Sequence, residues 1–139
     1  MLLRQSGNAR IQANQPGFFL AAEQVERIQI PTELDRSQGD VHAAGNPHVH
    51  WDPHRLLIIA KALVQRLQTI DPTHSADYQR NLDRFSANWK QHIRTWEAQT
   101  AALRGKKVIV YHKNWRYLLN WLNIEAVSYT HLTLPTISS

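Results

Sequence analysis

The sequence predicts an α/β fold in which two parts of the chain are separated by one long helix. Three observations favour it. A sustained helical pattern runs over about residues 73–103, short stretches rich in branched apolar residues lie on both sides of it, and the second half has the order strand, helix, strand. With 139 residues, 42% of them hydrophobic and 19% charged, the chain can form a globular core.

Composition excludes some classes of site and partner. The chain has no cysteine, so it contains neither a disulfide scaffold nor a thiolate metal site. The formal net charge is +5, but the basic residues are spread out and form no nucleic-acid-reading motif, so we expect no nucleic-acid partner. No apolar run approaches the ~20 residues of a membrane span. The first six residues lack the apolar core of a secretory signal.

The first half predicts an irregular start, a strand, a loop and a helix. Residues 1–24 contain several breakers and predict irregular structure, and residues 25–30 predict a short strand. Residues 31–47, with two prolines and two glycines, predict a long loop that is functional or disordered. Asp52 and Pro53 then fit the cap and first position of a helix that ends near residue 70. Its apolar stripe is Leu56, Leu57, Ala60, Leu63, Val64 and Leu67.

A second, longer helix is predicted over residues 73–103, since apolar side chains recur there at steps of three or four with no Gly or Pro inside. At ~1.5 Å per residue it spans roughly 45 Å. So long a helix suggests either a strut between two lobes or a hairpin with its neighbour. Gly105 is expected to end it, because glycine accepts a positive φ. The stripe is Tyr78, Leu82, Phe85, Trp89, Ile93 and Trp96.

The second half predicts an α/β unit with a right-handed crossover. Residues 107–111 form a continuous apolar run typical of a buried parallel strand, and residues 124–127 begin another. The helix between them, over residues 113–122, has Trp115, Leu118, Leu119 and Leu122 on one side. Residues 128–139 differ in style and resemble the translated read-through of a sequencing adaptor, so we expect them, with His131, to lie outside the native fold.

Histidines mark the candidate chemistry. Four of the eight lie within thirteen residues: His42, His48, His50 and His54. Neutral imidazole is a common zinc ligand, and in an extended segment His48 and His50 point to the same face. The alternative is two loop histidines, one packed and one solvated. His112 ends a strand where α/β sheets bind ligands; its alternative role is capping or packing with Asn114.

Catalytic motifs are absent from the sequence. It has no nucleophile elbow, no phosphate-binding glycine loop and no His-Glu-x-x-His pair. Asp35, Asp40 and Asp52 flank the histidines and leave a hydrolytic zinc site open. Asp52 is better explained as a helix cap. Three other histidines are expected to be solvated: His54, His74 and His92.

Two motifs carry a family resemblance. Residues 39–53, GDVHAAGNPHVHWDP, resemble the Asn-Pro-His-x-x-x-Asp-Pro signature of the metal-binding solute-binding proteins of ABC transporters, the TroA-like periplasmic family that carries zinc and manganese. Residues 105–115, GKKVIVYHKNW, resemble its second signature, a strand that ends in Tyr-His followed by Ser/Asn-Trp. The long helix between them resembles the rigid helix that joins the two lobes in that family. The likeness covers residues 2–127.

The resemblance implies a metal site of three histidines and one carboxylate, drawn from both lobes. His48 matches the histidine of the N-lobe loop, and His112 the histidine at the start of the C-lobe. The third histidine is expected upstream of residue 1 and the carboxylate downstream of residue 127. His50 departs from the pattern, where relatives carry Trp or Gln, and is a supplementary candidate. His42 is a candidate for metal relay or support of the site.

The resemblance also implies a partial two-lobed protein. Residues 1–72 are expected to be the end of the N-lobe, 73–104 the interlobe helix, 105–127 the start of the C-lobe and 128–139 a non-native tail. The implied function is capture of a divalent metal, zinc or alternatively manganese, for an ABC permease at the inner membrane. We expect a monomeric binding protein rather than an enzyme, periplasmic or lipid-anchored, with its signal sequence missing here. The alternatives are a zinc hydrolase that uses the His-x-His site and a basic helical interaction module.

Overall fold

The computed structural model describes residues 2–28, 45–110 and 112–128. The chain forms two compact units, one of residues 1–26 with 53–94 and one of residues 27–52 with 95–139. The first unit is helical, and the second contains the strands. Each unit therefore combines segments that are far apart in the sequence.

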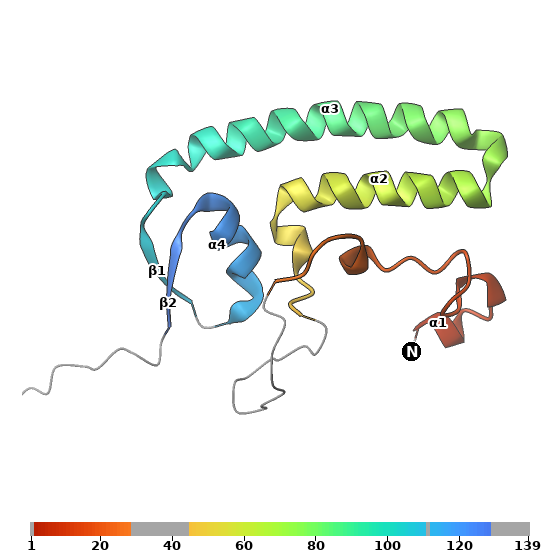
Figure 1. The fold of residues 1–139 in the computed structure, drawn as a ribbon, viewed down its shortest axis with the longest axis horizontal. Coiled ribbons are helices and arrows are strands. Elements are labelled where there is room, and N and C mark those ends of the chain that lie inside the picture. The colour runs from red at the N-terminus through yellow and green to blue at the C-terminus, as the bar shows by residue number, and fades with distance from the viewer. Residues whose placement is uncertain (1, 29–44, 111, 129–139) are drawn as a thin grey trace, which may run out of the picture. The chain divides into compact units, whose positions relative to one another are not determined.

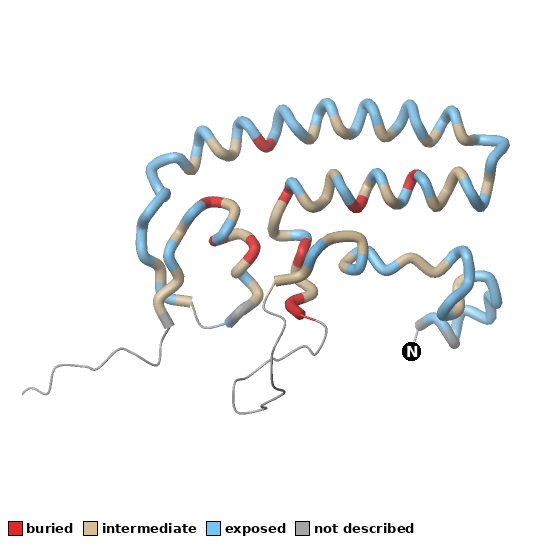
Figure 2. The backbone as a smooth tube through the Cα atoms, in the orientation of Figure 1, coloured by how far each residue is buried: buried red, intermediate tan, exposed pale blue. Residues whose placement is uncertain are grey.

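The first unit is built on two antiparallel helices, α2 (Pro53–Ile70) and α3 (Ser75–Gln99), which lie side by side in Figure 1. Each helix has one stripe of buried or partly buried side chains, and most other positions of α3 are exposed (Figure 2). Trp89 Nε1 donates to the Pro53 carbonyl at 2.9 Å and ties α3 to the first turn of α2. The hairpin with its neighbour, one of the two arrangements that the sequence suggests for the long helix, is formed, and the role of a strut between lobes stays a prediction. The buried apolar side chains of the pair are Pro53, Ile59, Val64 and Ile93.

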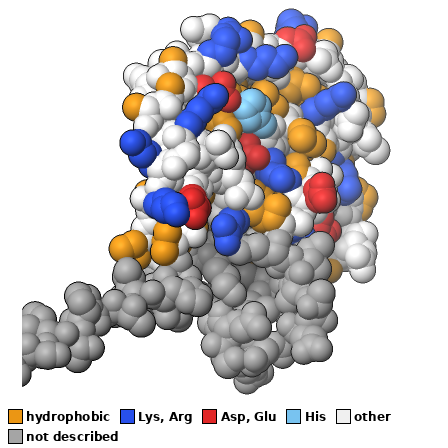
Figure 3. Space-filling model, turned by 60° about the vertical axis from the view of Figure 1, so that its left-hand side comes forward, with side chains coloured by type: hydrophobic (Ala, Val, Ile, Leu, Met, Phe, Trp, Pro, Cys, Tyr) orange, Lys and Arg blue, Asp and Glu red, His pale blue; other side chains and the backbone are white. Residues whose placement is uncertain are grey.

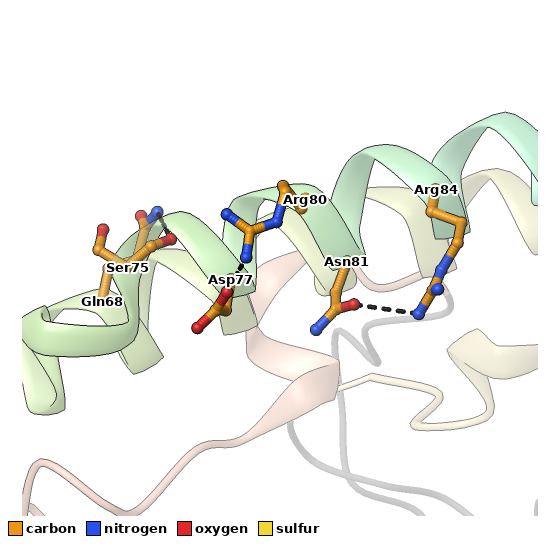
Figure 4. Close-up of polar contacts among 6 residues, drawn as sticks. All are labelled: Gln68, Ser75, Asp77, Arg80, Asn81 and Arg84. Carbon is orange, nitrogen blue, oxygen red and sulfur yellow. Dashed lines mark hydrogen bonds and ion pairs between the residues drawn. The ribbon is translucent and has the colours of Figure 1, made fainter.

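The exposed side of the helix pair is held by short-range polar contacts (Figure 4). Arg80 pairs with Asp77 three residues before it, and Arg84 Nη2 donates to Asn81 Oδ1 at 3.1 Å. Such neighbours on a helix surface are individually weak. The apolar stripe must therefore supply most of the stability of the pair. At the turn between the helices, Gln68 Nε2 donates to the Ser75 carbonyl at 3.2 Å.

The long helix is shorter than the sequence predicts. α3 has 25 residues, which corresponds to about 37 Å. The flanking residues of the predicted span, Pro72–His74 and Ala101–Leu103, form 3-10 turns instead. Pro72 has no N–H to donate, and the Thr100 hydroxyl bonds the Trp96 carbonyl at 2.7 Å. Tightening into 3-10 turns is common where an α-helix ends.

The sequence predicts irregular structure for the N-terminal segment. The structure differs, because this segment forms three short helices. Gly17 lies close to the Arg10 backbone, where a Cβ would meet the Arg10 carbonyl oxygen at 2.7 Å. Arg66 of α2 donates from Nη1 to the Pro16 carbonyl at 2.9 Å and so holds this segment on the helix. The short helices are α1 (Leu2–Gln5), Ala9–Ile11 and Ala21–Gln24.

The second unit contains a parallel pair of strands joined through α4. β1 (Lys107–Val110) pairs with β2 (Glu125–Ser128), with Lys107 opposite Glu125. The predicted strand, helix, strand order is confirmed, although a 3-10 turn at Lys113–Trp115 precedes α4 (Arg116–Leu122). α4 buries Tyr117, Leu119 and Leu122. It also meets the end of α3, because Trp121 Nε1 donates to Glu97 Oε1 at 3.1 Å.

Two residues with positive φ set the start of the strand pair. Asn123 (φ 53°) ends α4 and donates to the carbonyls of Asn120 and Leu119. Gly105 (φ 71°) donates to the Asn123 carbonyl at 2.8 Å. Glycine and asparagine are the residues that accept this left-handed conformation most readily. Gly105 lets the chain turn into β1, and Asn123 lets it turn from α4 into β2. The two strands therefore begin in register for pairing.

The prediction that β1 is buried is wrong. Ile109 is 61% exposed, and the strand alternates between exposed and partly buried positions. Parallel sheets are normally covered on both faces. Within the described residues, two strands and one crossover helix are too few to cover both.

The predicted strand over residues 25–30 is not formed by residues 25–28, and residues 29–30 lie outside the described ones. The Ile28 N–H donates to the Tyr117 hydroxyl at 3.1 Å, and the Ile28 carbonyl accepts the Asn46 N–H at 2.9 Å. A side chain and a loop thus use the backbone groups that a neighbouring strand would need. The pattern of β-branched residues alone did not reveal this.

Other predictions fall mainly on residues that the structure does not describe. Only residues 45–47 of the predicted loop 31–47 are described. Of the predicted tail, residues 129–139 lie outside the described part, while Ser128 pairs with Val110 as the last residue of β2. The predicted domain boundaries stay a prediction, and the compact units group the residues differently.

Charge is mixed on the surface. Figure 3 shows Lys and Arg side chains interspersed with acidic and apolar ones on the face that it presents. Within the described ranges, no helix is long and apolar enough to cross a membrane.

The turn between α2 and α3 contains a carboxylate, that of Asp71, which contacts the side chains of Tyr78 and His74. Asp71 Oδ2 accepts the Tyr78 hydroxyl at 2.8 Å and lies 2.8 Å from His74 Nδ1. The Tyr78 hydrogen bond, followed by that of His74, lowers the pKa of Asp71 below its ordinary 3.8. The same bond raises the pKa of Tyr78 above its ordinary 10.0.

We predict that this turn responds to pH at both extremes. The lowered pKa of Asp71 means a contribution to stability that is present above pH 3.8 and lost as the pH falls below it. The raised pKa of Tyr78 means a contribution present below pH 10.0 and lost as the pH rises past it. Asp71→Asn should return the pKa of Tyr78, followed by NMR of its ring, towards 10.0. Asp83→Asn is the matched control, and an unchanged Tyr78 titration in Asp71→Asn would contradict the assignment.

Candidate functional site

His48 lies on a tight turn that leads into α2. Gly45, with φ of 87°, starts the turn. His48 is the N-cap of a 3-10 helix at Val49–Trp51, and the Trp51 N–H donates to the His48 carbonyl at 3.2 Å. The extended geometry that would place His48 and His50 on one face is therefore not adopted.

Asn46 holds both the backbone and the ring of His48. Its Oδ1 accepts the His48 N–H at 3.0 Å and lies 2.9 Å from His48 Nδ1. The backbone N–H can only donate, so the group that faces it must be the amide oxygen. That oxygen can only accept from Nδ1, so the neutral ring carries its proton on Nδ1 and its lone pair on Nε2. Histidines that bind metal through Nε2 are held in this way, with Nδ1–H donated to an oxygen.

Asn46 is itself fixed by the rest of the second unit. Only 6% of its surface is exposed. Its N–H donates to the Ile28 carbonyl at 2.9 Å, and its carbonyl accepts the Tyr117 hydroxyl at 2.7 Å. Among the described residues, every buried side-chain nitrogen and oxygen has a hydrogen-bond partner. The orientation of His48 therefore depends on a buried residue that is itself hydrogen-bonded to Ile28 and Tyr117.

His50 lies next to His48 but is exposed. The two ring centroids are 6.0 Å apart with the planes tilted by 56°, and the His50 ring lies 5.3 Å from that of Trp51. The rings are neighbours because the chain turns between them. His50 stays a supplementary candidate beside His48.

His112 lies beyond the carboxyl end of β1 and is exposed. Trp115, which follows it in the next turn, has its ring centroid 4.5 Å from that of Trp51. α4 also contacts the Val49–Trp51 turn. The structure therefore brings together the segment that carries His48 and the segment that follows His112.

The other predicted site residues do not join this arrangement. His42, Asp35, Asp40 and His131 lie outside the described residues. His54, His74 and His92 are exposed, as the sequence predicts, and belong to the first unit. In the part of the chain that the structure describes, no three or more His, Asp or Glu residues group as a metal site.

Sequence reasoning missed Asn46 and Tyr117. Asn46 carried a signal, because asparagine side chains often bond the backbone two residues on. Tyr117 carried a weaker one, since a tyrosine in a helix between apolar residues needs a partner for its hydroxyl when buried. The predicted apolar face included Trp115, which is 41% exposed, and omitted Tyr117, which is 1% exposed.

One family model matches the chain. It is described as "ZnuA: Zinc-uptake complex component A periplasmic", and it matches residues 5–136. The match includes the turn with His48, the helix pair and the segment with His112. Comparison with curated protein sequences gave no match.

Solved structures share the fold. A zinc-bound deletion mutant of ZnuA aligns with a TM-score of 0.63 and 20% identity, covering 84% of this chain and 42% of that chain. A Zn(II)-bound point mutant of AdcAII from Streptococcus pneumoniae gives 0.62 and 16%, covering 84% and 41%. The laminin-binding protein Lbp of Streptococcus pyogenes gives 0.54 and 22%, covering 70% and 37%. The chain thus spans about two fifths of the length of these structures.

We predict that neutral His48 is found as the Nδ1–H tautomer in the metal-free protein. The Asn46 oxygen at 2.9 Å from Nδ1 is the physical cause. Long-range ¹H–¹⁵N correlation of the imidazole ring measures it. Asn46→Ala should remove the preference for Nδ1–H, and exposed His92 provides a reference for a ring outside this turn. A neutral His48 protonated on Nε2 would contradict the arrangement.

Proposed function

We propose that this chain, which belongs to the family of periplasmic zinc-uptake complex components, is part of a protein that captures a divalent metal ion and delivers it to an ABC permease. Zinc is the proposed ion, with manganese as the alternative. The observation that carries the proposal is the hold of Asn46 on His48, which directs the Nε2 lone pair of the signature histidine away from Asn46. The zinc-bound state of the similar ZnuA and AdcAII structures supports the choice of ion.

His48 and His112 are the two proposed ligands in this chain. The contact of Trp51 with Trp115 supports their pairing, because it joins the two segments at 4.5 Å between ring centroids. His50 is a supplementary ligand, and His42 keeps its proposed role in relay or support. The third histidine and the carboxylate would come from other parts of a longer protein. Imidazole-rich ligation favours zinc over manganese.

Capture fits this site better than catalysis does. A zinc site whose four positions are all filled by protein leaves no place for a reactive water. The two lobes of the proposed protein would close the site from both sides. No observation within the described residues favours the hydrolase that uses His48 and His50.

The chain is proposed to include the junction between the two lobes. Residues 1–72 would belong to the N-lobe, 73–104 to the connecting helix and 105–127 to the C-lobe. The 61% exposure of Ile109 supports this, since a parallel sheet of only two strands lacks the cover that a larger lobe supplies. The proposed protein is monomeric, binds no nucleic acid and works in the periplasm or from a lipid anchor.

We predict that removal of either proposed ligand weakens zinc binding selectively. His48→Ala and His112→Ala should each lower zinc affinity by more than the ~10–100-fold that loss of a ligand's supporting partner costs. Competition with a chromophoric chelator measures the affinity. His92→Ala is the matched control, because it removes an exposed imidazole from α3. Equal affinities of the three variants would overturn the ligand assignment, and hydrolytic turnover by the zinc-loaded protein would favour an enzyme.

A further inference from the structure

A buried hydroxyl bridges two backbone groups in the second unit. Residues that face each other in an antiparallel strand pair exchange two N–H···O bonds, and the contact of Ile28 with Asn46 can be compared with such a pair, although neither residue is in a strand. Ile28 and Asn46 make only one directly, from Asn46 N–H to the Ile28 carbonyl at 2.9 Å. In place of the other, the Ile28 N–H donates to the Tyr117 hydroxyl at 3.1 Å, and that hydroxyl donates to the Asn46 carbonyl at 2.7 Å.

This arrangement connects α4 to the ring of His48 through one residue. Asn46 accepts the Tyr117 hydroxyl with its backbone carbonyl and holds His48 with its side-chain oxygen. A displacement of the Asn46 backbone therefore moves the acceptor that orients His48. Because Tyr117 is 1% exposed, water cannot readily take the place of its hydroxyl.

The same hydroxyl lies on the helix that follows the second proposed ligand. α4 begins at Arg116, immediately after the Lys113–Trp115 turn that follows His112. The Tyr117 side chain thus joins the turn of one histidine to the helix next to the other. The Trp51–Trp115 contact connects the same two segments through apolar surface and carries no directional hydrogen bond.

We propose that Tyr117 is a positioning residue for the metal site, whose hydroxyl fixes the His48 turn on α4 and so sets the direction in which His48 presents Nε2. The part of this proposal that concerns metal binding rests on the proposed function. The effect of the Tyr117 hydroxyl on the His48 ring does not, because it is present in the metal-free protein. Tyr117 does not touch the ion and acts through Asn46.

The test is Tyr117→Phe, which removes the hydroxyl and keeps the ring. Two control variants also lose one side-chain donor. Tyr78→Phe loses the bond to Asp71 in the first unit, and Trp121→Phe loses the bond from α4 to Glu97. Each variant is examined by long-range ¹H–¹⁵N correlation of the His48 ring without metal and by zinc competition with a chelator.

The proposal expects Tyr117→Phe alone to mix the His48 tautomers and to weaken zinc binding about tenfold, the lower end of the effect of losing a ligand's support. Unchanged His48 ring signals in folded Tyr117→Phe would overturn it. Equal zinc losses in Trp121→Phe would also overturn it, because they would show a general effect of α4 stability. If the wild-type protein binds no zinc while Tyr117→Phe still changes the His48 tautomer, the proposed function fails and the positioning role stands.

A measurement on the wild-type protein covers the case in which Tyr117→Phe does not fold. If the hydroxyl couples the turn to α4, the amide protons of Asn46 and His48 should exchange with solvent at the same opening free energy as those of Leu119 and Leu122. Native-state hydrogen exchange resolves them individually. Exchange of the Asn46 and His48 amides through a separate, easier opening would overturn the proposal.

Discussion

The amide oxygen of Asn46 is the acceptor on which the geometry of the candidate site depends. It takes the backbone N–H of His48 and faces Nδ1 of the same residue, so it sets the turn and the ring together. Its own position is set by hydrogen bonds to Ile28 and Tyr117 in a buried environment. A buried polar group that loses a partner costs more than the bond itself contributes. The network is therefore expected to be retained as a whole or lost as a whole.

This constraint explains how the proposed site can lie on loops. Neither His48 nor His112 is inside an α-helix or a strand. The His48 turn is held by Asn46 and Tyr117, and the segment after His112 is held by the contact between Trp51 and Trp115. Ligands on loops stay mobile unless polar bonds and packing fix the loop. Here the fixed backbone of the turn takes the place of a rigid element.

The spacing of apolar residues at steps of three or four predicted the helices well, because one face of each helix is covered and the other is solvated. The pattern failed where contacts with residues distant in sequence determine the local structure or the exposure of a side chain. Ile28 bonds to a hydroxyl and a loop instead of a strand, and Ile109 is exposed although its run of apolar residues is typical of a buried strand. The candidate histidines were predicted from motif and place in the chain, and their role as metal ligands stays a prediction. Tyr117 was not found, because its role depends on Asn46, which is distant in sequence.

The most direct test of the role of His48 and His112 is a crystal structure of the zinc-loaded full-length protein. We expect His48 Nε2 and a ring nitrogen of His112 both to lie ~2.0–2.1 Å from the same ion. The Asn46 oxygen should still face His48 Nδ1 in that structure. Zinc bound through His48 Nδ1, or bound without either histidine, would contradict this role.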